Sequence, residues 1–361
     1  MRQRRIGRVF GPWPLRRAIT SLALALLALG LPGAGAQDSP IPLRVVGFYT
    51  HAGLYAEFEE PFWTTQVPLL THGRLRPTIA PLERTGIREP ELLSLIRLGV
   101  LPAATVPLAL AAGEDPELSV VDLPGLNPDL PALRRSLAQW RGHIAQVLED
   151  RYDIRLLALL VPTTQVIFCR EPFTGLGDIK GRRIRVGGIG QADLLEAVGA
   201  IPQVMPLREV VTAIGNRRLD CAITGSMPGN RIGLHRVTSH VSTLPINWFV
   251  SAVAMNGAIW RSLPEPVRAA LDRGLDTLEQ QVTDSAEAAI ADGFACNAGL
   301  PRCSGGTPGR MVVVPERWDE PQRRRLLETV LLPHWLRRCG QDCAAVWNRI
   351  AAPGLGIWAQ P

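Results

Sequence analysis

The chain has 361 residues, enough for two domains with separate hydrophobic cores. Its formal charge of +6 comes from the N-terminus, because residues 1–36 hold six arginines and no acidic residue, and the remainder holds 33 basic and 33 acidic residues. This balance excludes a basic nucleic-acid-binding domain, and we expect no nucleic-acid partner.

Residues 1–36 have the three parts of an export signal. A basic start is followed by an apolar run from Ala18 to Leu31 and by the small residues Ala34-Gly35-Ala36 before Gln37. The apolar run is shorter than the roughly 20 residues of a membrane span. We predict a cleaved signal peptide over 1–36 and a periplasmic location, with an uncleaved anchor as the alternative.

Hydrophobic periodicity predicts alternating strands and helices in the first half of the chain. Thr50 and His51 follow the first of these strands in a loop. A long helical pattern precedes the strand that ends near residue 161. We expect strands at 43–49, 76–80 and 154–161, and helices at 54–69 and 131–152.

The alternation is clearest between residues 176 and 227. Ile184 and Val186 predict a strand with Arg183 and Arg185 on its other face, and Gly199 is a plausible stop for the helix that follows. The expected order is strand 183–186, helix 191–198, strand 201–205, helix 207–214 and strand 219–224. Such a parallel α/β unit binds ligands at the carboxyl ends of its strands, where Arg185 and Thr224 lie.

A long helix is expected near the C-terminus. Ser262-Leu263-Pro264-Glu265 has the form of a capping box with proline in the first turn, and the helical pattern then continues to about Phe294. A short strand at 311–314 and a helix at 316–338 follow.

Several blocks of this sequence, taken in order, resemble one family. Asp178 to Val186 (DIKGRRIRV) is similar to the DLKGxKIRV block of the extracytoplasmic solute receptors of tripartite ATP-independent periplasmic (TRAP) transporters, dicarboxylate type. The other matching blocks follow in register: 197–200, 205–213, 219–220 and 255–264.

The resemblance implies a two-lobed, periplasmic-binding-protein-like α/β fold. Each lobe would hold a mainly parallel sheet flanked by helices, and a long helix would span both lobes. We expect lobe I to comprise residues 37–162 and 251–290, and lobe II residues 163–250. Residues 291–361 would form a C-terminal disulfide loop and helices that pack across the lobes.

Arg185 is the first candidate for ligand binding. In the family, the arginine at this motif position pairs with the substrate carboxylate, and its planar fork of donors suits that task. Arg183 is one step earlier and is expected to be structural. Gln165 occupies the position where the family often has a second arginine, which speaks against a compact dicarboxylate as substrate.

Further candidates surround these two positions. Thr224 and Ser226 replace an amide of the family pattern, and turn formation is their alternative role. Trp248 would either wall the cleft or pack in the core. From the other lobe, Thr50, His51 and Thr105 are the expected partners of Arg185.

The six cysteines fall in the exported part of the chain, where disulfides are permitted. Cys296 with Cys303, and Cys339 with Cys343, are close pairs that flank glycine-containing loops, so we predict two local bridges. A zinc site would require these four to converge. Cys169 and Cys221 are expected to be small buried residues rather than a redox pair.

The resemblance therefore predicts a transport protein that binds a small organic anion, expected to be a carboxylate. It would deliver this ligand to TRAP membrane permease subunits driven by an ion gradient, as a monomer or dimer without cofactor or metal. The alternatives are a periplasmic hydrolase or isomerase, with Ser226, Asp220 and His235 or His240 as an imaginable triad, and a ligand-sensing module.

Overall fold

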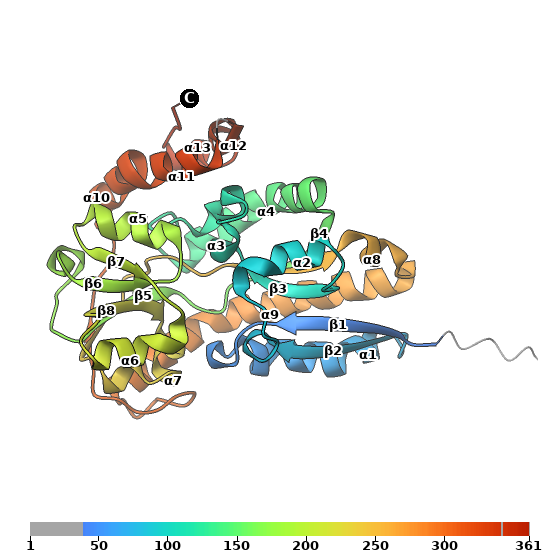
Figure 1. The fold of residues 1–361 in the computed structure, drawn as a ribbon, viewed down its shortest axis with the longest axis horizontal. Coiled ribbons are helices and arrows are strands. Elements are labelled where there is room, and N and C mark those ends of the chain that lie inside the picture. Colours follow the sequence, from blue (N-terminus) through green and yellow to red (C-terminus); the bar gives the residue numbers. More distant parts are fainter. Residues whose placement is uncertain (1–38, 341, 361) are drawn as a thin grey trace, which may run out of the picture. The chain divides into compact units, whose positions relative to one another are not determined.

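Two β-sheets organise the chain, and each is the centre of one lobe (Figure 1). The structure is a computed structural model that describes residues 39–340 and 342–360, so the predicted signal peptide lies outside the described residues. We call the lobe built on the five-stranded sheet lobe I and the lobe built on the six-stranded sheet lobe II. The two-lobed α/β fold is as predicted.

The sheet of lobe I has the order β2-β1-β3-β10-β4. Its strands are β1 (Ile41–Gly47), β2 (Leu75–Pro81), β3 (Ala103–Pro107), β4 (Ile154–Leu160) and β10 (Ser251–Asn256). Strands β1, β2 and β3 are parallel, whereas β10 runs antiparallel to both β3 and β4. The returning chain thus supplies a central strand of the first sheet.

The sheet of lobe II has the order β11-β9-β5-β8-β6-β7. Its strands are β5 (Gln165–Cys169), β6 (Arg183–Val186), β7 (Ile201–Val204), β8 (Cys221–Gly225), β9 (His240–Ser242) and β11 (Val312–Val314). Strands β7, β6 and β8 are parallel, and β5 is antiparallel to β8. Both sheets are therefore mixed, each with its crossing strand reversed.

Helices cover the faces of both sheets. In lobe I they are α1 (Val67–Leu70), α2 (Leu92–Arg97), α3 (Leu108–Ala111), α4 (Leu130–Tyr152) and α8 (Gly257–Ser262). In lobe II they are α5 (Ile189–Ala197), α6 (Val210–Gly215) and α7 (Ser226–Arg231). The remaining helices are α9 (Glu265–Ala298), α10 (Glu320–Leu326), α11 (Leu332–Cys339), α12 (Asp342–Ile350) and α13 (Ala352–Leu355).

Shorter helical turns complete the chain. The expected helix at 54–69 contains two π-helical turns before α1, and a third lies between α10 and α11. The π turns are Tyr55–Glu59, Phe62–Gln66 and Leu327–Leu331. The 3₁₀ turns are Thr50–Ala52, Leu82–Arg84, Glu89–Glu91, Pro116–Asp122, Leu176–Ile179, Leu207–Glu209 and Leu234–Arg236.

The predicted long helix is α9, which packs against α1 and β4 of lobe I and against α7 and β11 of lobe II (Figure 1). Glu279 fixes it to lobe I, because its carboxylate accepts hydrogen bonds from Arg141 at 2.6 Å and from the backbone N–H of Leu159 at 2.8 Å. At the lobe II end, a Cβ on Gly293 would lie 2.5 Å from Ser226, so glycine allows the close approach of α9 and α7.

The predicted capping box at the start of α9 is wrong. The N-cap of α9 is Pro264 and has no side-chain cap. Ser262 instead closes the preceding short helix α8, where its hydroxyl donates to the carbonyl of Ile259 at 2.7 Å. Ser262 therefore belongs to α8, a short helix that the periodicity did not predict.

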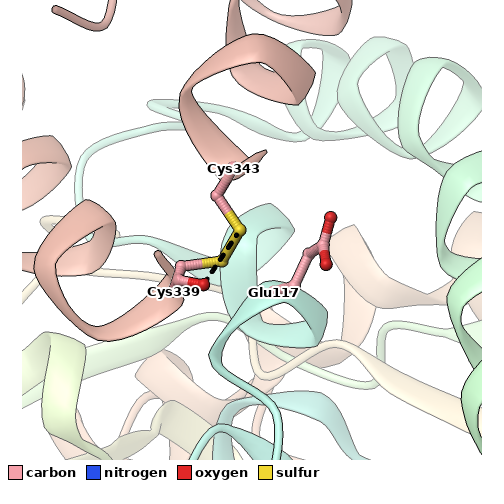
Figure 2. A group of neighbouring side chains, drawn as sticks. All are labelled: Glu117, Cys339 and Cys343. Carbon is pink, nitrogen blue, oxygen red and sulfur yellow. Dashed lines mark hydrogen bonds between the residues drawn. A yellow bond between two sulfur atoms is a disulfide. The ribbon is translucent and has the colours of Figure 1, made fainter. Parts of the chain in front are cut away.

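The two predicted local disulfides are present, Cys296–Cys303 and Cys339–Cys343. Figure 2 shows the second of them beside Glu117. The expectation for Cys169 and Cys221 is wrong, because they form a third bridge. They are 52 residues apart in sequence, but they oppose each other in the antiparallel β5–β8 pair with Cα atoms 4.1 Å apart.

Two of the crossings between the lobes, from β4 to β5 and from β9 to β10, are hydrogen-bonded to each other. The backbone N–H of Gln165 donates to the carbonyl of Asn247 at 2.8 Å, and the N–H of Ile246 donates to the carbonyl of Gln165 at 2.9 Å. Just beyond, Phe249 adopts a φ of 54°, which is uncommon for a residue other than glycine. This pair of crossings forms a hydrogen-bonded connection between the two sheets.

Asp122 of lobe I holds the second crossing in place. Its buried carboxylate accepts the backbone N–H groups of Trp248 at 2.7 Å and Phe249 at 2.9 Å, and the side-chain amide of Asn247 at 3.1 Å. Burial raises the pKa of Asp122 to about 7, although these donors act in the opposite direction. The strained turn at Phe249 is thus stabilised by a side chain distant in sequence.

We predict that Asp122→Ala lowers the free energy of unfolding by about 3 kcal/mol, because three donors lose a buried acceptor. Urea unfolding of the mature protein measures this change. The matched control is Asp129→Ala, which removes the exposed N-cap of α4 and should cost about 1 kcal/mol. Equal losses in both variants would show that Asp122 has no special role.

Candidate functional site

Arg185 lies near the carboxyl end of β6, between the parallel neighbours β7 and β8. Its Nε donates to the carbonyl of Met205 at 2.9 Å, and its Nη1 donates to the carbonyl of Ile223 at 2.9 Å. Both acceptors are neutral, and among the described residues the guanidinium forms no ion pair. Burial lowers its pKa to about 10, an effect that Tyr49 and Glu89 partly offset. The group therefore remains a cation at neutral pH, without a bonded counter-ion.

Arg183 lies two residues earlier on the same strand and, unlike Arg185, forms an ion pair. Its Nε and Nη2 donate to the two carboxylate oxygens of Asp220 at 3.0 and 2.8 Å. Its Nη2 also donates to the carbonyl of Arg217 at 2.8 Å. Arg183 is thus neutralised within lobe II, in keeping with its predicted structural role.

The loop after β1 and the turns that carry Glu83 and Glu89 form one hydrogen-bonded wall of lobe I. Tyr49 donates its hydroxyl to Glu89, and its ring lies 5.1 Å from that of His51. Thr50 donates its backbone N–H to Glu83 at 3.1 Å and its hydroxyl to the same carboxylate at 2.5 Å. Sequence reasoning selected Thr50 and His51 in this loop and did not single out Tyr49, Glu83 or Glu89.

The ionisation of this wall follows from its burial. Burial lowers the pKa of His51, so the ring is neutral at neutral pH. Burial, together with the hydrogen bond and charge of Glu89, raises the pKa of Tyr49 far above its usual value. Partial burial also raises the pKa of Glu83, but the hydrogen bonds from Thr50 outweigh it and the net shift is downward. The wall thus presents neutral rings beside the ionised carboxylate of Glu83.

Gln165 and Thr224 lie at the same edge of the lobe II sheet as Arg185. Gln165 begins β5 opposite Gly225, and Thr224 pairs with Val166. Both side chains are buried, and neither makes a hydrogen bond to any other residue that the structure describes. Their polar groups therefore remain available at this edge.

Three other candidates have their polar groups engaged inside the protein. Thr105 donates its hydroxyl to the buried carboxylate of Glu59, which also accepts the backbone N–H of Phe48 at 2.6 Å. Ser226 donates to the carbonyl of Ile290 in α9 at 3.1 Å. Trp248 donates its indole N–H to the carbonyl of Asn127 at 2.7 Å and belongs to the main core cluster.

A chain of hydrogen bonds connects the crossing to the strand that carries Arg185. Asn247, bound by Asp122, accepts through its Oδ1 from the side-chain amide of Gln191 at 2.8 Å. Gln191 in turn accepts the backbone N–H of Gly187 at 2.7 Å, two residues after Arg185. The same groups that fix the crossing therefore also fix the end of β6.

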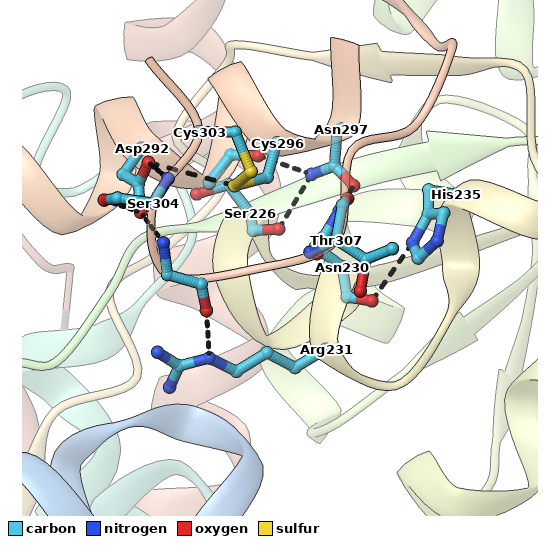
Figure 3. Close-up of a disulfide and its surroundings, with 12 residues drawn as sticks. Ser226, Asn230, Arg231, His235, Asp292, Cys296, Asn297, Cys303, Ser304 and Thr307 are labelled. Carbon is cyan, nitrogen blue, oxygen red and sulfur yellow. Dashed lines mark hydrogen bonds between the residues drawn. A yellow bond between two sulfur atoms is a disulfide. The ribbon is translucent and has the colours of Figure 1, made fainter. Parts of the chain in front are cut away.

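A second contact between the lobes lies beside the Cys296–Cys303 disulfide (Figure 3). Arg231 at the end of α7 pairs with Glu57 of lobe I at 2.9 Å and donates to the carbonyl of Gly305 at 3.1 Å. Asp292 of α9 holds the loop by accepting the backbone N–H groups of Ser304 at 2.8 Å and Gly305 at 2.7 Å. The disulfide loop thus positions the arginine that bridges the lobes.

The imaginable catalytic triad is not assembled. Ser226 is bonded to α9, Asp220 to Arg183, His235 to the carbonyl of Asn230, and His240 to Ser239. Two clusters have the spacing of metal ligands, Glu117 with Cys339 and Cys343, and Asp292 with Cys296 and Cys303. In both, the sulfurs are bonded to each other and are not thiolates (Figures 2 and 3).

No helix within residues 39–340 and 342–360 combines the length and the apolar character needed to cross a membrane.

Comparison with protein families gives a match to the bacterial extracellular solute-binding protein, family 7, over residues 65–292. A solute-binding protein of Albidiferax ferrireducens is 28% identical over 183 residues, which are 48% of this chain and 53% of that protein. The C4-dicarboxylate-binding periplasmic protein DctP of Rhodobacter capsulatus is 26% identical over 163 residues, which are 44% of this chain and 48% of that protein. The chain thus spans about half the length of these relatives.

Solved structures of TRAP receptors share the fold. DctP7 of Bordetella pertussis, an extracytoplasmic solute receptor binding pyroglutamic acid, has a TM-score of 0.73 at 20% identity and covers 83% of this chain and 96% of its own. A TRAP periplasmic solute-binding protein of Desulfovibrio salexigens with bound orotic acid has a TM-score of 0.74 at 19% identity. The match covers 86% of this chain and 99% of that protein. A TRAP periplasmic solute-binding protein of Roseobacter denitrificans with bound β-D-glucuronate has a TM-score of 0.71 at 16% identity. The match covers 86% of this chain and 97% of that protein.

We predict that Glu59→Gln flattens the dependence of stability on pH. Burial raises the pKa of Glu59 to about 7 from an ordinary value of 4.5, whereas hydrogen bonds from Thr105 and Phe48 act against this shift. The protonated group therefore favours the folded state fully below pH 4.5, and this contribution is lost as the pH rises to about 7.

Urea unfolding at several pH values between 4.5 and 7.5 measures the effect. Over this range the wild type should lose about 3 kcal/mol more than the variant. Parallel curves for the two proteins would contradict a raised pKa for Glu59.

We predict that Arg231→Ala weakens ligand binding by up to about fivefold, because the pair with Glu57 is partly exposed and contributes about 0.2–1 kcal/mol to closure. Faster ligand dissociation in stopped-flow experiments would carry most of the change. The control is Arg261→Ala, whose pair with Asp153 lies within lobe I and should leave dissociation unchanged. Equal rates in both variants would remove the bridging role of Arg231.

Proposed function

The chain belongs to family 7 of the bacterial extracellular solute-binding proteins, the TRAP receptors, and from this membership we propose that it captures a small organic anion between its two lobes. The anion is a carboxylate held by Arg185. Receptors of this class bind rather than transform their ligands, and the proposal includes no catalytic step.

One observation carries the proposal, namely the uncompensated charge of Arg185. A partly buried guanidinium is desolvated at a cost unless it is paired, and its five N–H donors prefer an anionic acceptor. Here two of these donors reach neutral carbonyls, while every described carboxylate lies beyond ion-pair distance. A ligand carboxylate at the carboxyl edge of the sheet would supply the missing counter-ion and accept the remaining donors.

The surrounding residues support a ligand of this kind. Gln165 and Thr224 offer a neutral amide and a hydroxyl at the edge where Arg185 lies. Thr50 and His51 approach from lobe I, so a ligand that touches both lobes would stabilise the closed form. The related structures with bound pyroglutamic acid, orotic acid and glucuronate contain carboxylic acids of the expected size.

Delivery to a TRAP permease and a periplasmic location complete the proposed role. The export signal expected in residues 1–36 would place the receptor on the same side of the membrane as the mouth of the permease. The permease would recognise the closed, loaded form, whose lobes are fixed relative to each other by the ligand and by the Arg231–Glu57 pair.

We predict that Arg185→Ala loses the binding of carboxylates. Removing one partner of a buried charge pair costs about 2–5 kcal/mol, so affinity should fall by roughly 30-fold to several thousandfold. The empty variant should be at least as stable as the wild type, because an unpaired buried charge is removed.

Calorimetry with a panel of carboxylates, phosphates and neutral sugars provides the measurement. Arg183→Ala is the matched control, since this arginine lies on the same strand but pairs with Asp220. Carboxylate binding should survive in the control. A best ligand without an acidic group, or equal affinity in the Arg185 variant, would refute the proposal.

A further inference from the structure

Gly187 lies two residues after Arg185, and the side on which a side chain would project faces the guanidinium. A Cβ on Gly187 would lie 3.5 Å from Nη1 and 3.5 Å from Nη2 of Arg185, with Cζ next at 3.7 Å. The backbone of Gly187 is held separately, because its N–H donates to the side-chain oxygen of Gln191 at 2.7 Å. The missing side chain therefore leaves a space at a fixed place beside the outer end of the guanidinium.

The same two nitrogens carry the donors of Arg185 that have no acceptor. A guanidinium has five N–H groups, one on Nε and two on each Nη. Nε donates to the carbonyl of Met205, and one N–H of Nη1 donates to the carbonyl of Ile223. Among the described residues, no acceptor is bonded to the second N–H of Nη1 or to either N–H of Nη2. The free donors and the space at Gly187 thus lie at the same end of the side chain.

The fold itself does not require glycine at position 187. Two other glycines of lobe II are required, because Gly181 has a φ of 75° and a Cβ on Gly225 would lie 2.6 Å from Thr163. Gly187 has no left-handed backbone, and 3.5 Å is an ordinary contact distance for a Cβ. Alanine would therefore fit here. A glycine without a conformational or packing reason, beside unfilled donors, indicates that its space serves a group that the chain does not supply.

Resting on the function proposed above, we propose that Gly187 is a specificity-determining residue of the ligand site. The ligand carboxylate lies in the space that Gly187 leaves, and its two oxygens accept from Nη1 and Nη2 of Arg185. An oxygen bonded at about 2.9 Å needs the same region as a side-chain carbon 3.5 Å from the same nitrogens. A side chain at position 187 therefore competes with the ligand carboxylate.

Gly187→Ala separates this role from a structural one. Crowding by one methyl group should lower the affinity for acids about tenfold or more. The ligand-free variant should be at least as stable as the wild type, because alanine restricts the unfolded chain more than glycine does. Calorimetry measures the affinity, and urea unfolding measures the stability. The probe is the acid that binds the wild type most tightly in the carboxylate panel, which includes butyrate, lactate, pyruvate and benzoate.

Gly187→Asp places a carboxylate of the chain itself in this space. The aspartate should pair with Arg185 and raise the midpoint of urea unfolding without ligand. It should weaken acid binding about 100-fold or more, because the space is filled and the new charge repels an anion. The matched controls are Gly177→Ala and Gly177→Asp, since Gly177 is exposed in the same lobe and a Cβ there would meet nothing within 4 Å. Both controls should bind acids as the wild type does.

The outcomes separate this inference from the proposed function. If Arg185→Ala abolishes binding but both Gly187 variants bind acids like the wild type, only the role of Gly187 is refuted. A loss of stability in Gly187→Ala refutes it as well, because the fold would then require the glycine. If no acid of the panel binds the wild type, the function based on Arg185 fails and this inference fails with it.

Discussion

The buried carboxylate of Asp122 binds the segment that returns from lobe II to lobe I, and these hydrogen bonds determine how the two lobes are joined. Asp122 accepts the N–H groups of a turn whose central residue, Phe249, has a left-handed conformation. That turn directs the chain into β10, which lies between β3 and β4. Through Asn247 and Gln191 the same contacts extend to the end of β6. The connection between the lobes and the position of the end of β6 thus depend on one hydrogen-bonded network.

Charged side chains in this protein differ in whether the chain itself supplies their hydrogen-bond partners and counter-ions. Asp122 and Glu59 are surrounded by donors from their own chain, and Arg183 is neutralised by Asp220. Arg185 alone in this group is bonded only to neutral carbonyls. Two arginines that are two residues apart on one strand thus differ, since Arg183 is paired with a carboxylate and Arg185 is bonded to carbonyls.

The sequence predicted the parts of the fold that depend on local pattern. The strand–helix alternation from β6 to β8, the long α9 and the Gly199 stop all follow from periodicity and turn chemistry. The Cys169–Cys221 bridge was missed because only the pairing of β5 with β8 brings the residues together. The motif position of Arg185 could be recognised, but Tyr49 and Glu89 come together through tertiary folding and follow no spacing rule. The internal bonds of Thr105 and Ser226 likewise depend on partners distant in sequence.

The position of β10 has a consequence for the order of folding. Strands β3 and β4 are separated in the finished sheet by a strand that begins only at Ser251, after five of the six strands of lobe II. During synthesis, lobe I therefore lacks a central strand until most of lobe II has emerged, and β4 has no other strand to pair with. Contacts of such long sequence separation form slowly. The sheet of lobe I therefore cannot be completed until five of the six strands of lobe II have been made.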